Sequence, residues 1–533
     1  MVGRRGLAVL GLGVVTALTA ACGGGGGGAA GTAPASGGTG GGTAAGGTLV
    51  VDTSFQLKTA DPARQFEPTA QTVLYPVYET LVTYKGADVK TAVPGVAELP
   101  EIDESFKKFT FTLRDGVKFS DGTPMTAKDV VYTFERIAGL KGNPSFLLDG
   151  IKAEAPDDKT VVLTTEKADA ALMAKLSNPA LGIENSAAVE KIGGTKDAES
   201  DKAEPEFAKA SYGSGPYKIT KFDAASEVVL ERNDGYWGTK PAYSKIVVRN
   251  VQANVQQLNL TQGGSQLALD LRPDQATSLG ENVTVNKTAA ADIAFLLVND
   301  DPSVSATTSN KDFQEAVRYG VDYAGLLNLV GEGAVQPGGV VPSMFSGALA
   351  PADAVKRDVA RAKAALAKSG ISSPSVKLNY ASDLTYKGVS MADIAARIQQ
   401  NLKEVGIDVQ LDGKPVTTSL DSYRAGKDEL SLQWWGPDYN HPNDYLLFTP
   451  GQMVGLRAGW KEDAAPEITK LAEKAETADD ATRDADFQAL QKAMNAEGPF
   501  IPLFQPSAVV AGAKQLGPLE YNTLWTVDLT ALR

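Results

Sequence analysis

The sequence predicts an α/β protein, because short buried strands alternate along it with amphipathic helices. The clearest indication is a strand–helix–strand unit in the second half of the chain. Residues 376–380 and 407–411 are predicted strands, and between them Ile394, Ile398 and Leu402 recur at helical spacing. Such a unit places its two strands in parallel, with the helix against one face of the sheet.

The composition is that of a globular, acidic protein. The chain has 533 residues, of which 43% are hydrophobic and 22% charged, and this length suffices for about two to four domains. The net charge of −13 argues against a nucleic-acid partner, since phosphate contacts need clustered Lys and Arg. Cys22 and His441 are the only Cys and His, which excludes an internal disulfide and a Cys- or His-rich metal site. An oxygen-ligand metal site or a pre-formed metal chelate stays open.

Residues 1–21 predict an export signal peptide. Arg4 and Arg5 precede an apolar stretch at 7–18 that is too short to span a bilayer comfortably. The Leu-Thr-Ala-Ala-Cys that follows, residues 18–22, resembles the processing site of bacterial lipoproteins, in which the cysteine becomes the lipid-bearing N-terminus. We therefore expect lipid on Cys22, and the alternative is an ordinary secretory signal with an incidental cysteine.

Residues 22–46 predict a lipid-anchored flexible linker, because they are nearly all Gly, Ala, Thr and Ser. About 25 such residues reach roughly 25–30 Å. No later stretch is long and apolar enough to predict a transmembrane helix. This layout predicts an extracytoplasmic protein held by lipid at the outer face of the cell membrane.

The globular body begins with a predicted buried strand at residues 48–52. Residues 109–114 alternate apolar and polar side chains like a half-buried strand, and the Asp-Gly pair at 115–116 favours a hairpin with a returning strand at 117–119. Thr126 and Asp129 have the spacing of a capping box, which predicts a helix from there onward. Further strands are predicted at 228–230, 245–248, 295–299 and 500–504, and helices at 464–495.

Four sequence blocks are specific enough to indicate a family. The longest is LRDGVKFSDGTPMTAKDV at residues 113–130, and the others are GSGPY at 213–217, ERNDGYW at 231–237 and DFQEAVRYGVD at 312–322. In this order they resemble the blocks of ABC-transporter solute-binding proteins of the peptide/nickel class, the oligopeptide- and dipeptide-binding family 5. The resemblance covers essentially everything from residue 47 to the C-terminus.

The resemblance implies a two-lobed periplasmic-binding-protein-like fold of type II, in its three-domain form, with a ligand cleft between the lobes. The expected domain I comprises residues 47–95, 206–292 and 498–533, domain II residues 96–205, and domain III residues 293–497. The chain would then cross between domains I and III twice, near residues 293 and 497. Two such crossings form a hinge, and a ligand that contacts both lobes favours closure.

The segment at residues 434–445 contains the main candidate binding residues. It combines two Trp, two Tyr and His441 with prolines and acids, which suits either a ligand pocket or a well-packed irregular loop. By resemblance, Trp435, Asp438 and Tyr439 form the family's Trp-x-x-Asp-Tyr block on the domain III side of the cleft. In peptide-binding members the Asp of this block takes the α-ammonium of the ligand, and that role falls on Asp438.

The opposite wall of the cleft is expected from domain I, where Gln65, Phe66 and Glu67 align with the family's other contact segment. Trp434, with Trp435, would also suit stacking against a sugar face. His441 lies where the family more often has an acid, and it is either a loop residue or a contact to the ligand or to a metal chelate. No Arg directly precedes Trp435, which predicts that a peptide's C-terminal carboxylate is recognised weakly or differently.

The function that these observations predict is that of a lipid-anchored, monomeric binding protein of an ABC importer. It would capture peptides or another amine-bearing solute and deliver them to a permease with separate ATPase subunits, since the chain has no phosphate-binding Gly-Lys-Ser/Thr loop. No cofactor, metal or catalytic residue is expected. The same fold binding a sugar or oligosaccharide, an opine or a nickel chelate is the alternative, and a signalling or adhesion role also stays open. An extracytoplasmic hydrolase with a nucleophilic triad would have to use His441.

Overall fold

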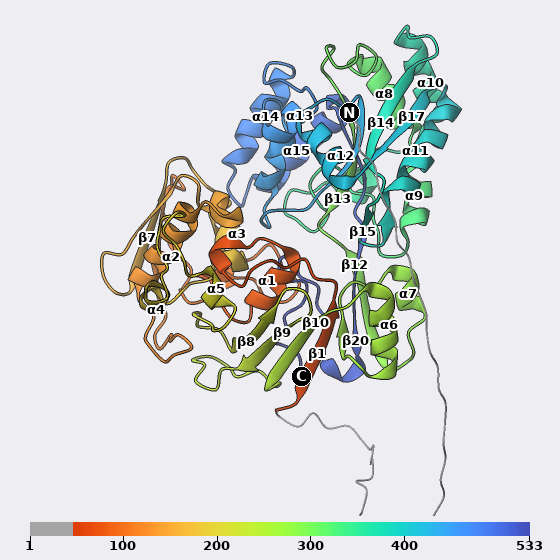
Figure 1. The fold of residues 1–533 in the computed structure, drawn as a ribbon. Coiled ribbons are helices and arrows are strands. Elements are labelled where there is room, and N and C mark those ends of the chain that lie inside the picture. The colour runs from red at the N-terminus through yellow and green to blue at the C-terminus, as the bar shows by residue number, and fades with distance from the viewer. Residues whose placement is uncertain (1–45) are drawn as a thin grey trace, which may run out of the picture. The chain divides into compact units, whose positions relative to one another are not determined.

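The computed structural model describes residues 46–533, which contain sheets of seven, five and four strands and two two-stranded sheets (Figure 1). No helix in this part of the chain is long and apolar enough to cross a membrane. The predicted export signal, the predicted lipid on Cys22 and, apart from Gly46, the predicted linker lie outside the described residues.

The seven-stranded sheet joins segments that are far apart in the sequence. Its strands, in spatial order, are β12 (Val283–Ala289), β20 (Ser507–Ala513), β11 (Leu267–Ala268), β1 (Thr48–Thr53), β10 (Lys245–Asn250), β9 (Glu227–Arg232) and β8 (Tyr217–Asp223). The helices that belong to these segments are η1 (Pro62–Arg64), α1 (Pro68–Leu74), α6 (Ala253–Gln262), α7 (Pro273–Thr277) and η6 (Lys514–Leu516). Strand β1 lies between two parallel partners, β10 and β11, so both of its edges are paired. The predicted strands at 48–52, 228–230 and 245–248 are confirmed.

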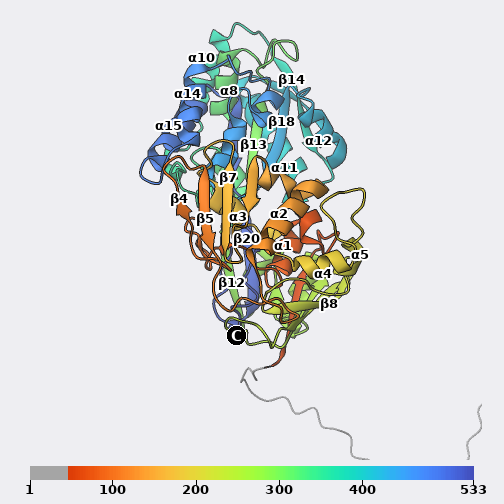
Figure 2. The same cartoon turned by 90° about the vertical axis from the view of Figure 1, so that its left-hand side faces the viewer.

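The four-stranded sheet is antiparallel and lies beside α2 and α3 (Figure 2). Its strands, in spatial order, are β4 (Glu101–Ile102), β5 (Lys108–Thr112), β7 (Thr160–Thr165) and β6 (Ile151–Glu154). The helices of this region are α2 (Ala127–Leu140), η2 (Asn143–Leu148), α3 (Leu172–Leu176), η3 (Pro179–Leu181), α4 (Ser186–Lys191) and α5 (Glu204–Phe207). The predicted capping box is confirmed, since the Asp129 carboxylate accepts from the backbone N–H of Thr126 at 2.9 Å at the start of α2.

The hairpin predicted after residue 114 is wrong. Gly116 does adopt the positive φ of a tight turn, 79°, but residues 117–119 form no strand. Strand β5 pairs instead with β4 and with β7, some fifty residues further along the chain. The Asp-Gly turn at 115–116 therefore marks the end of β5 but does not identify its partner strand. The partner is the strand that completes the buried face of the sheet.

Helices cover both faces of the five-stranded sheet. Its strands, in spatial order, are β17 (Asp408–Lys414), β14 (Ser375–Ala381), β18 (Leu430–Trp435), β13 (Ile293–Val298) and β19 (Phe500–Phe504). One face packs against α8 (Lys311–Gly320), α9 (Tyr323–Val330), α10 (Val359–Lys368) and α11 (Met391–Val405). The other face packs against α12 (Val416–Arg424), η5 (Pro442–Phe448), α13 (Met453–Arg457), α14 (Pro466–Glu476) and α15 (Arg483–Glu497). The predicted parallel pair, β14 with β17, and the helices predicted at 464–495 are confirmed.

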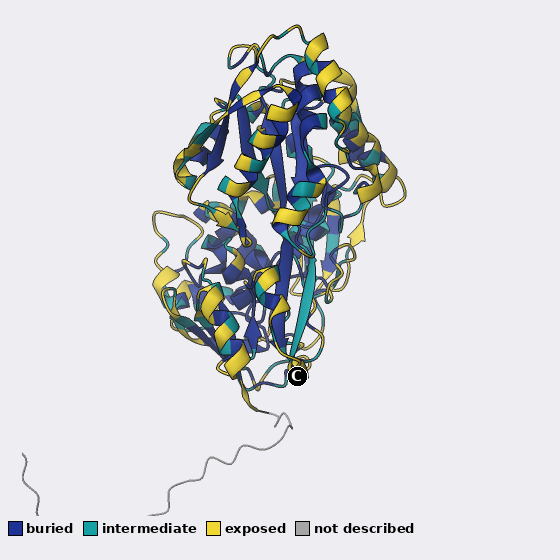
Figure 3. Ribbon diagram, turned by 90° about the vertical axis from the view of Figure 1, so that its right-hand side faces the viewer, coloured by how far each residue is buried: buried dark blue, intermediate teal, exposed yellow. Residues whose placement is uncertain are grey.

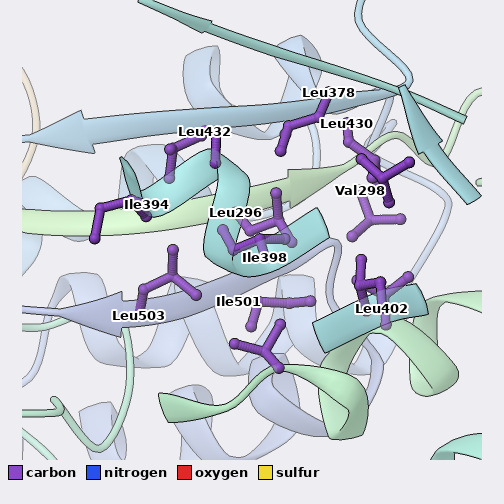
Figure 4. Packing of buried hydrophobic residues seen from close by; sticks show 14 of the residues in the cluster. Leu296, Val298, Leu378, Ile394, Ile398, Leu402, Leu430, Leu432, Ile501 and Leu503 are labelled. Atoms are coloured by element: carbon purple, nitrogen blue, oxygen red, sulfur yellow. The ribbon is translucent and has the colours of Figure 1, made fainter. Parts of the chain in front are cut away.

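Strand β13 shows how the sequence specifies two covered faces. All six of its residues are buried, and they alternate between two apolar clusters. Leu296 and Val298 contact the α8–α11 side, whereas Phe295 and Leu297 contact the α12–α15 side. Figure 4 shows the first of these clusters, in which leucines and isoleucines from four strands meet α11. In Figure 3 the strands are accordingly buried, and exposed residues lie on the outer faces of the helices.

The remaining elements are short. The two small sheets are β2 (Val82–Thr83) with β3 (Val93–Pro94), and β15 (Thr385–Tyr386) with β16 (Val389–Ser390), and one further 3₁₀ helix is η4 (Pro351–Asp353). The chain passes from the seven-stranded to the five-stranded sheet between β12 and β13, and back between β19 and β20. The predicted domain III ends at residue 497, before β19 begins. Strand β19 nevertheless pairs with β13 in the five-stranded sheet. We therefore propose that domain III extends through β19, and otherwise keep the predicted domains as a prediction.

A buried ion network connects η1 with α2 and the loops that follow it. Arg136 of α2 is fully buried, and its guanidinium donates to Asp61 at 2.6 and 2.9 Å, to Glu184 at 2.9 Å and to Asp201 at 3.2 Å. Arg64 also pairs with Asp201, at 3.0 Å. Three carboxylates thus share two guanidinium groups, and burial raises the pKa of Glu184 to about 8.

We expect Glu184→Gln to change how stability depends on pH. The pKa of Glu184 in the folded protein lies above its ordinary value near 4.5, so the folded state holds this proton more tightly between those two pH values. Wild-type stability should therefore fall as pH rises through that window, and the glutamine variant should gain stability relative to wild type. Urea denaturation near pH 6 and pH 9 measures this difference, and parallel pH profiles would contradict it.

Arg136→Met is the contrasting variant, which should lose about 3–5 kcal/mol of folding stability because it leaves buried carboxylates without a counter-charge.

Candidate functional site

The segment at residues 434–445 begins as a strand and ends as a 3₁₀ helix. Trp434 and Trp435 are the last two residues of β18, so the prediction that the whole segment is irregular is wrong for them. The irregular part is residues 436–441, and η5 follows with His441 as its N-cap. Because β18 is a central strand of the five-stranded sheet, the loop after it starts from a rigid position.

A cavity of about 500 Å³ opens beside this loop. One wall comes from residues 146–175, which belong to η2, β7 and the region of α3, and the other comes from residues 438–476. Of the predicted contact residues, Asp438 and Tyr439 line it. This volume is in the range of pockets that hold small organic ligands.

The Asp438 carboxylate faces this cavity without a partner. Its carboxylate oxygens form no hydrogen bond and no ion pair with any residue between 46 and 533, while its backbone is fixed at both ends. The backbone N–H donates to Asp444 Oδ2 at 3.2 Å, and the carbonyl accepts from Asn178 Nδ2 at 3.2 Å. Burial raises the pKa of Asp438 to about 6, so the carboxylate is mostly ionised at neutral pH. Its negative charge has no cationic partner among residues 46–533.

Asp444 is the site residue that the sequence analysis missed. It is only 1% exposed and lines the same cavity. Its Oδ2 accepts from Trp435 Nε1 at 3.1 Å and from the backbone of Asp438, and burial together with the Asp438 charge raises its pKa well above the ordinary range. The two carboxyl groups therefore titrate as a coupled pair, in which Asp444 holds its proton more tightly than an ordinary carboxyl group does. An Asp two residues after a His-Pro pair, in the first turn of η5, was the available signal.

Tyr439 forms part of the cavity wall next to an internal ion pair. The Lys175 ammonium lies 5.5 Å from the centre of the Tyr439 ring and 2.8 Å from the Asp169 carboxylate. Burial first, and then the charges of several surrounding carboxylates, raise the pKa of Tyr439 well above the ordinary value. The phenol is therefore neutral and surrounded by negative potential.

Trp434 and Trp435 do not line the cavity. Successive residues of a strand point to opposite faces, and these two pack into different clusters. Trp434 stacks on Tyr386 with ring centres 5.2 Å apart, and Trp435 packs edge-on against Phe448 at 5.7 Å. Trp435 acts on the site through its hydrogen bond to Asp444, and ligand contact by either ring stays a prediction.

His441 lies behind the cavity wall. It is 8% exposed, its Nδ1 accepts from the backbone N–H of Asn443 at 3.2 Å, and its Nε2 has no partner within residues 46–533. Burial, and then the charges of Arg483 and Lys175, lower its pKa to about 3. The imidazole is therefore neutral. It does not line this cavity, and ligand contact by His441 stays a prediction.

The predicted domain I contacts do not line the cavity. Gln65 is fully buried, and neither side-chain amide atom has a partner in the described chain. Phe66 packs edge-on against Phe146 at 5.3 Å, and Phe146 is part of the cavity wall. Glu67 pairs with Lys58 at 3.0 Å. Of the three, Phe66 thus supports the wall through Phe146, and contact of all three with ligand stays a prediction.

The second wall has no counterpart among the predicted site residues. It brings the carboxylates of Asp149, Glu166 and Asp169 to the cavity, with Lys167 and Lys175. No sequence motif marks these positions, which lie more than 260 residues before Asp438. Across residues 46–533 no group of three or more His, Cys, Asp or Glu side chains is arranged to hold a metal ion.

Comparison with known proteins gives one family. The model described as "Bacterial extracellular solute-binding proteins, family 5 Middle" matches residues 91–452. The probable D,D-dipeptide-binding periplasmic protein of Escherichia coli (strain K12) is 28% identical over 489 residues, which are 89% of this chain and 92% of that protein. The match confirms the resemblance seen in the sequence blocks.

Solved structures share the fold. The ABC transporter substrate-binding protein CtaP from Listeria monocytogenes superposes with a TM-score of 0.79 at 20% identity, covering 92% of this chain and 99% of that one. The ABC transporter-associated periplasmic binding protein DppA from Helicobacter pylori, in complex with the peptide STSA, gives 0.71 at 23% identity, with 92% and 97% covered. The predicted α/β fold of the periplasmic-binding-protein kind is thereby confirmed.

We expect the single histidine to stay neutral across the physiological pH range. Because Nδ1 accepts a backbone hydrogen bond, the ring proton belongs on Nε2, and the lowered pKa of His441 keeps it there down to about pH 3. Since the chain has one histidine, the NMR signals of its ring are unambiguous. They should not shift between pH 5 and pH 8 in the folded protein. In urea the same signals should titrate near the ordinary pKa of about 6.5, and a titration near that value in the folded protein would show that the ring is exposed.

Proposed function

Since the chain belongs to the bacterial extracellular solute-binding proteins of family 5, we propose that its solute bears an amine, in the first instance the α-ammonium of a peptide. Proteins of this family are the solute-binding components of ABC importers for peptides or related ligands. The relative from E. coli is named for D,D-dipeptides, and the H. pylori structure holds a peptide, so peptides are the class to which these names point.

One observation carries the proposal: Asp438 offers a partly buried carboxylate to a ligand-sized cavity and has no partner there. A carboxylate taken out of water loses solvation, and a ligand ammonium at hydrogen-bonding distance restores it. The removal of either partner of such a pair is costly because the other charge is left unpaired. Asp438 therefore acts as the selective group for an amine.

Asp444 positions this carboxylate. Its Oδ2 accepts from Trp435 Nε1 and from the backbone N–H of Asp438, which fixes the backbone of Asp438 beside the cavity. Burial, and then the charge of Asp438, raise the pKa of Asp444, so a second negative charge beside Asp438 is unfavourable.

The alternative solutes are less well supported by the cavity. The pair predicted to stack on a sugar face, Trp434 and Trp435, packs into the two clusters of the five-stranded sheet, so Phe146 and Tyr439 are the aromatic residues that line the cavity. A nickel chelate held by histidine would need His441, which is not part of the cavity wall. These two observations favour an amine over a sugar or a metal chelate, and they leave an opine, which also carries a nitrogen, within the proposal.

We further propose that the protein is a monomer held by lipid on Cys22 at the outer face of the cell membrane. The linker that follows would let the body, which starts at β1, move over roughly 25–30 Å and present its solute to an ABC permease with separate ATPase subunits. The body itself has no helix suited to span a membrane within residues 46–533, so attachment would rest on the lipid. No catalytic role is proposed.

Cys22→Ser should release the protein from the membrane. A serine cannot carry the thioether-linked lipid, so the variant should appear in the soluble extracytoplasmic fraction while wild type remains with the membrane. Cell fractionation with mass spectrometry of the N-terminal peptide measures both the location and the modification. A variant that stays with the membrane, or an unmodified wild-type Cys22, would contradict lipid anchoring and leave the ligand site unaffected.

Asp438→Asn should weaken the binding of an α-amino ligand by about tenfold or more. Thermal stability should change little or rise slightly, because the variant removes a buried charge that has no partner in the free protein. Thermal shifts with Ala-Ala and with N-acetyl-Ala-Ala measure this, since native-state binding at a hundredfold excess over Kd adds about 2.7 kcal/mol. Asp463→Asn, the same change at an exposed position outside the cavity, is the control.

The same experiment has a pH readout. Binding of an ammonium needs ionised Asp438, so wild-type affinity should fall about tenfold from pH 7.5 to pH 5, as the group with a pKa of about 6 becomes protonated. Affinity of the asparagine variant should stay flat over this range. Equal affinities of wild type and variant at pH 7.5 would remove Asp438 from the proposed role.

A further inference from the structure

The cavity carries more negative charge than one ligand ammonium neutralises. Six of its lining residues are acids, namely Asp149, Glu166, Asp169, Asp438, Asp444 and Glu476, and only two, Lys167 and Lys175, are bases. Lys175 is already neutralised by Asp169 at 2.8 Å. No arginine is present among the lining residues that the structure describes.

The first charge of the ligand accounts for only part of this excess. Asp438 takes the proposed α-ammonium, and Asp444, whose pKa is raised by burial and by the Asp438 charge, is left out of the count. Three carboxylates, those of Asp149, Glu166 and Glu476, then remain against the single ammonium of Lys167. The cavity with one ammonium bound is therefore still negative.

Two of the remaining carboxylates form a unit on the wall opposite Asp438. Residues 149–150 and 165–166 lie side by side where β6 meets β7, and the backbone N–H of Glu166 donates to the carbonyl of Gly150 at 3.1 Å. The Asp149 N–H donates to the carbonyl of Phe146, so this edge is held by backbone bonds to the aromatic part of the wall. The side chains of Asp149 and Glu166 form no ion pair within the described residues, and so are available to a ligand.

One of the six acids also has a free oxygen atom that faces the cavity. Asp444 is almost completely buried, it lines the cavity, and its Oδ1 has no hydrogen-bond partner in residues 46–533. A buried polar atom that opens into a cavity without a partner is expected to be satisfied by what fills the cavity.

From this arrangement we propose that the solute is a small dication, whose second positive charge lies at Asp149 and Glu166 while its first lies at Asp438. The two carboxylate groups come from opposite walls of the cavity and repel each other, and a ligand with two separated ammonium groups removes this repulsion. A ligand carboxylate, in contrast, would meet only Lys167. Basic dipeptides and linear diamines share the required chemistry. The inference rests on the proposed amine-binding function and adds the second charge to it.

The test compares ligands that differ in one charge. Lys-Ala and Nε-acetyl-Lys-Ala have the same backbone and similar length, and only the first is a dication in its amine groups. Isothermal titration of the whole protein should give at least about tenfold tighter binding of Lys-Ala, with a difference that shrinks as salt is added. Cadaverine, titrated in the same buffer, distinguishes a diamine from a basic peptide: binding as tight as that of Lys-Ala supports a dication and assigns it to the diamines.

The double variant Asp149→Asn/Glu166→Gln locates the second charge. It should bring the affinity for Lys-Ala down to that for Nε-acetyl-Lys-Ala. Asp115→Asn, on the exposed turn after β5, is the matched surface control and should preserve the difference. Both changed residues are exposed, so the fold should survive, and a thermal melt verifies it.

Two outcomes would overturn the inference. If wild type binds Lys-Ala and its acetylated form equally, or if the double variant keeps the full difference, the second charge is not recognised here while the proposed amine-binding function stands. If neither these peptides nor Ala-Ala nor cadaverine binds, the proposed function fails together with the inference.

Discussion

The site depends on the repulsion between two carboxyl groups held on one loop. Asp438 donates its backbone N–H to Asp444, and Trp435 fixes the same Asp444 oxygen, so the two acids cannot move apart. Water is largely excluded there, and two negative charges so close would be very unfavourable. Burial raises the pKa of both acids, and the charge of Asp438 raises the pKa of Asp444 further, so Asp438 is the carboxylate that gains most from a cationic partner.

The position of that loop is set by the two-sided packing of the five-stranded sheet. Strand β18 lies between β14 and β13, and each face of the sheet is covered by its own set of helices. Because both tryptophans at the end of β18 are anchored in these clusters, the chain leaves the strand in a fixed direction. The tryptophans thus contribute rigidity, and the acids that follow contribute the chemistry.

The opposite wall depends on a different kind of interaction. Glu166 directly follows β7 of the four-stranded sheet, and the buried network around Arg136 connects α2 of the same region to η1 of the first segment. An ion network of this kind is directional, so it favours one placement of these elements over others. The acids of the second wall are thereby presented to the cavity by elements that are themselves fixed.

The sequence by itself determined the local elements and the family. The capping box at Thr126 and Asp129, the parallel pair flanking α11 and the family blocks all rest on neighbouring residues, and each is confirmed. The sequence also singled out Asp438. Only the tertiary structure decided that Asp444 is buried beside it and that Glu166 faces it from another sheet. The reason is physical: periodicity and capping act over a few residues, whereas burial, pKa and cavity lining depend on which distant segments pack together.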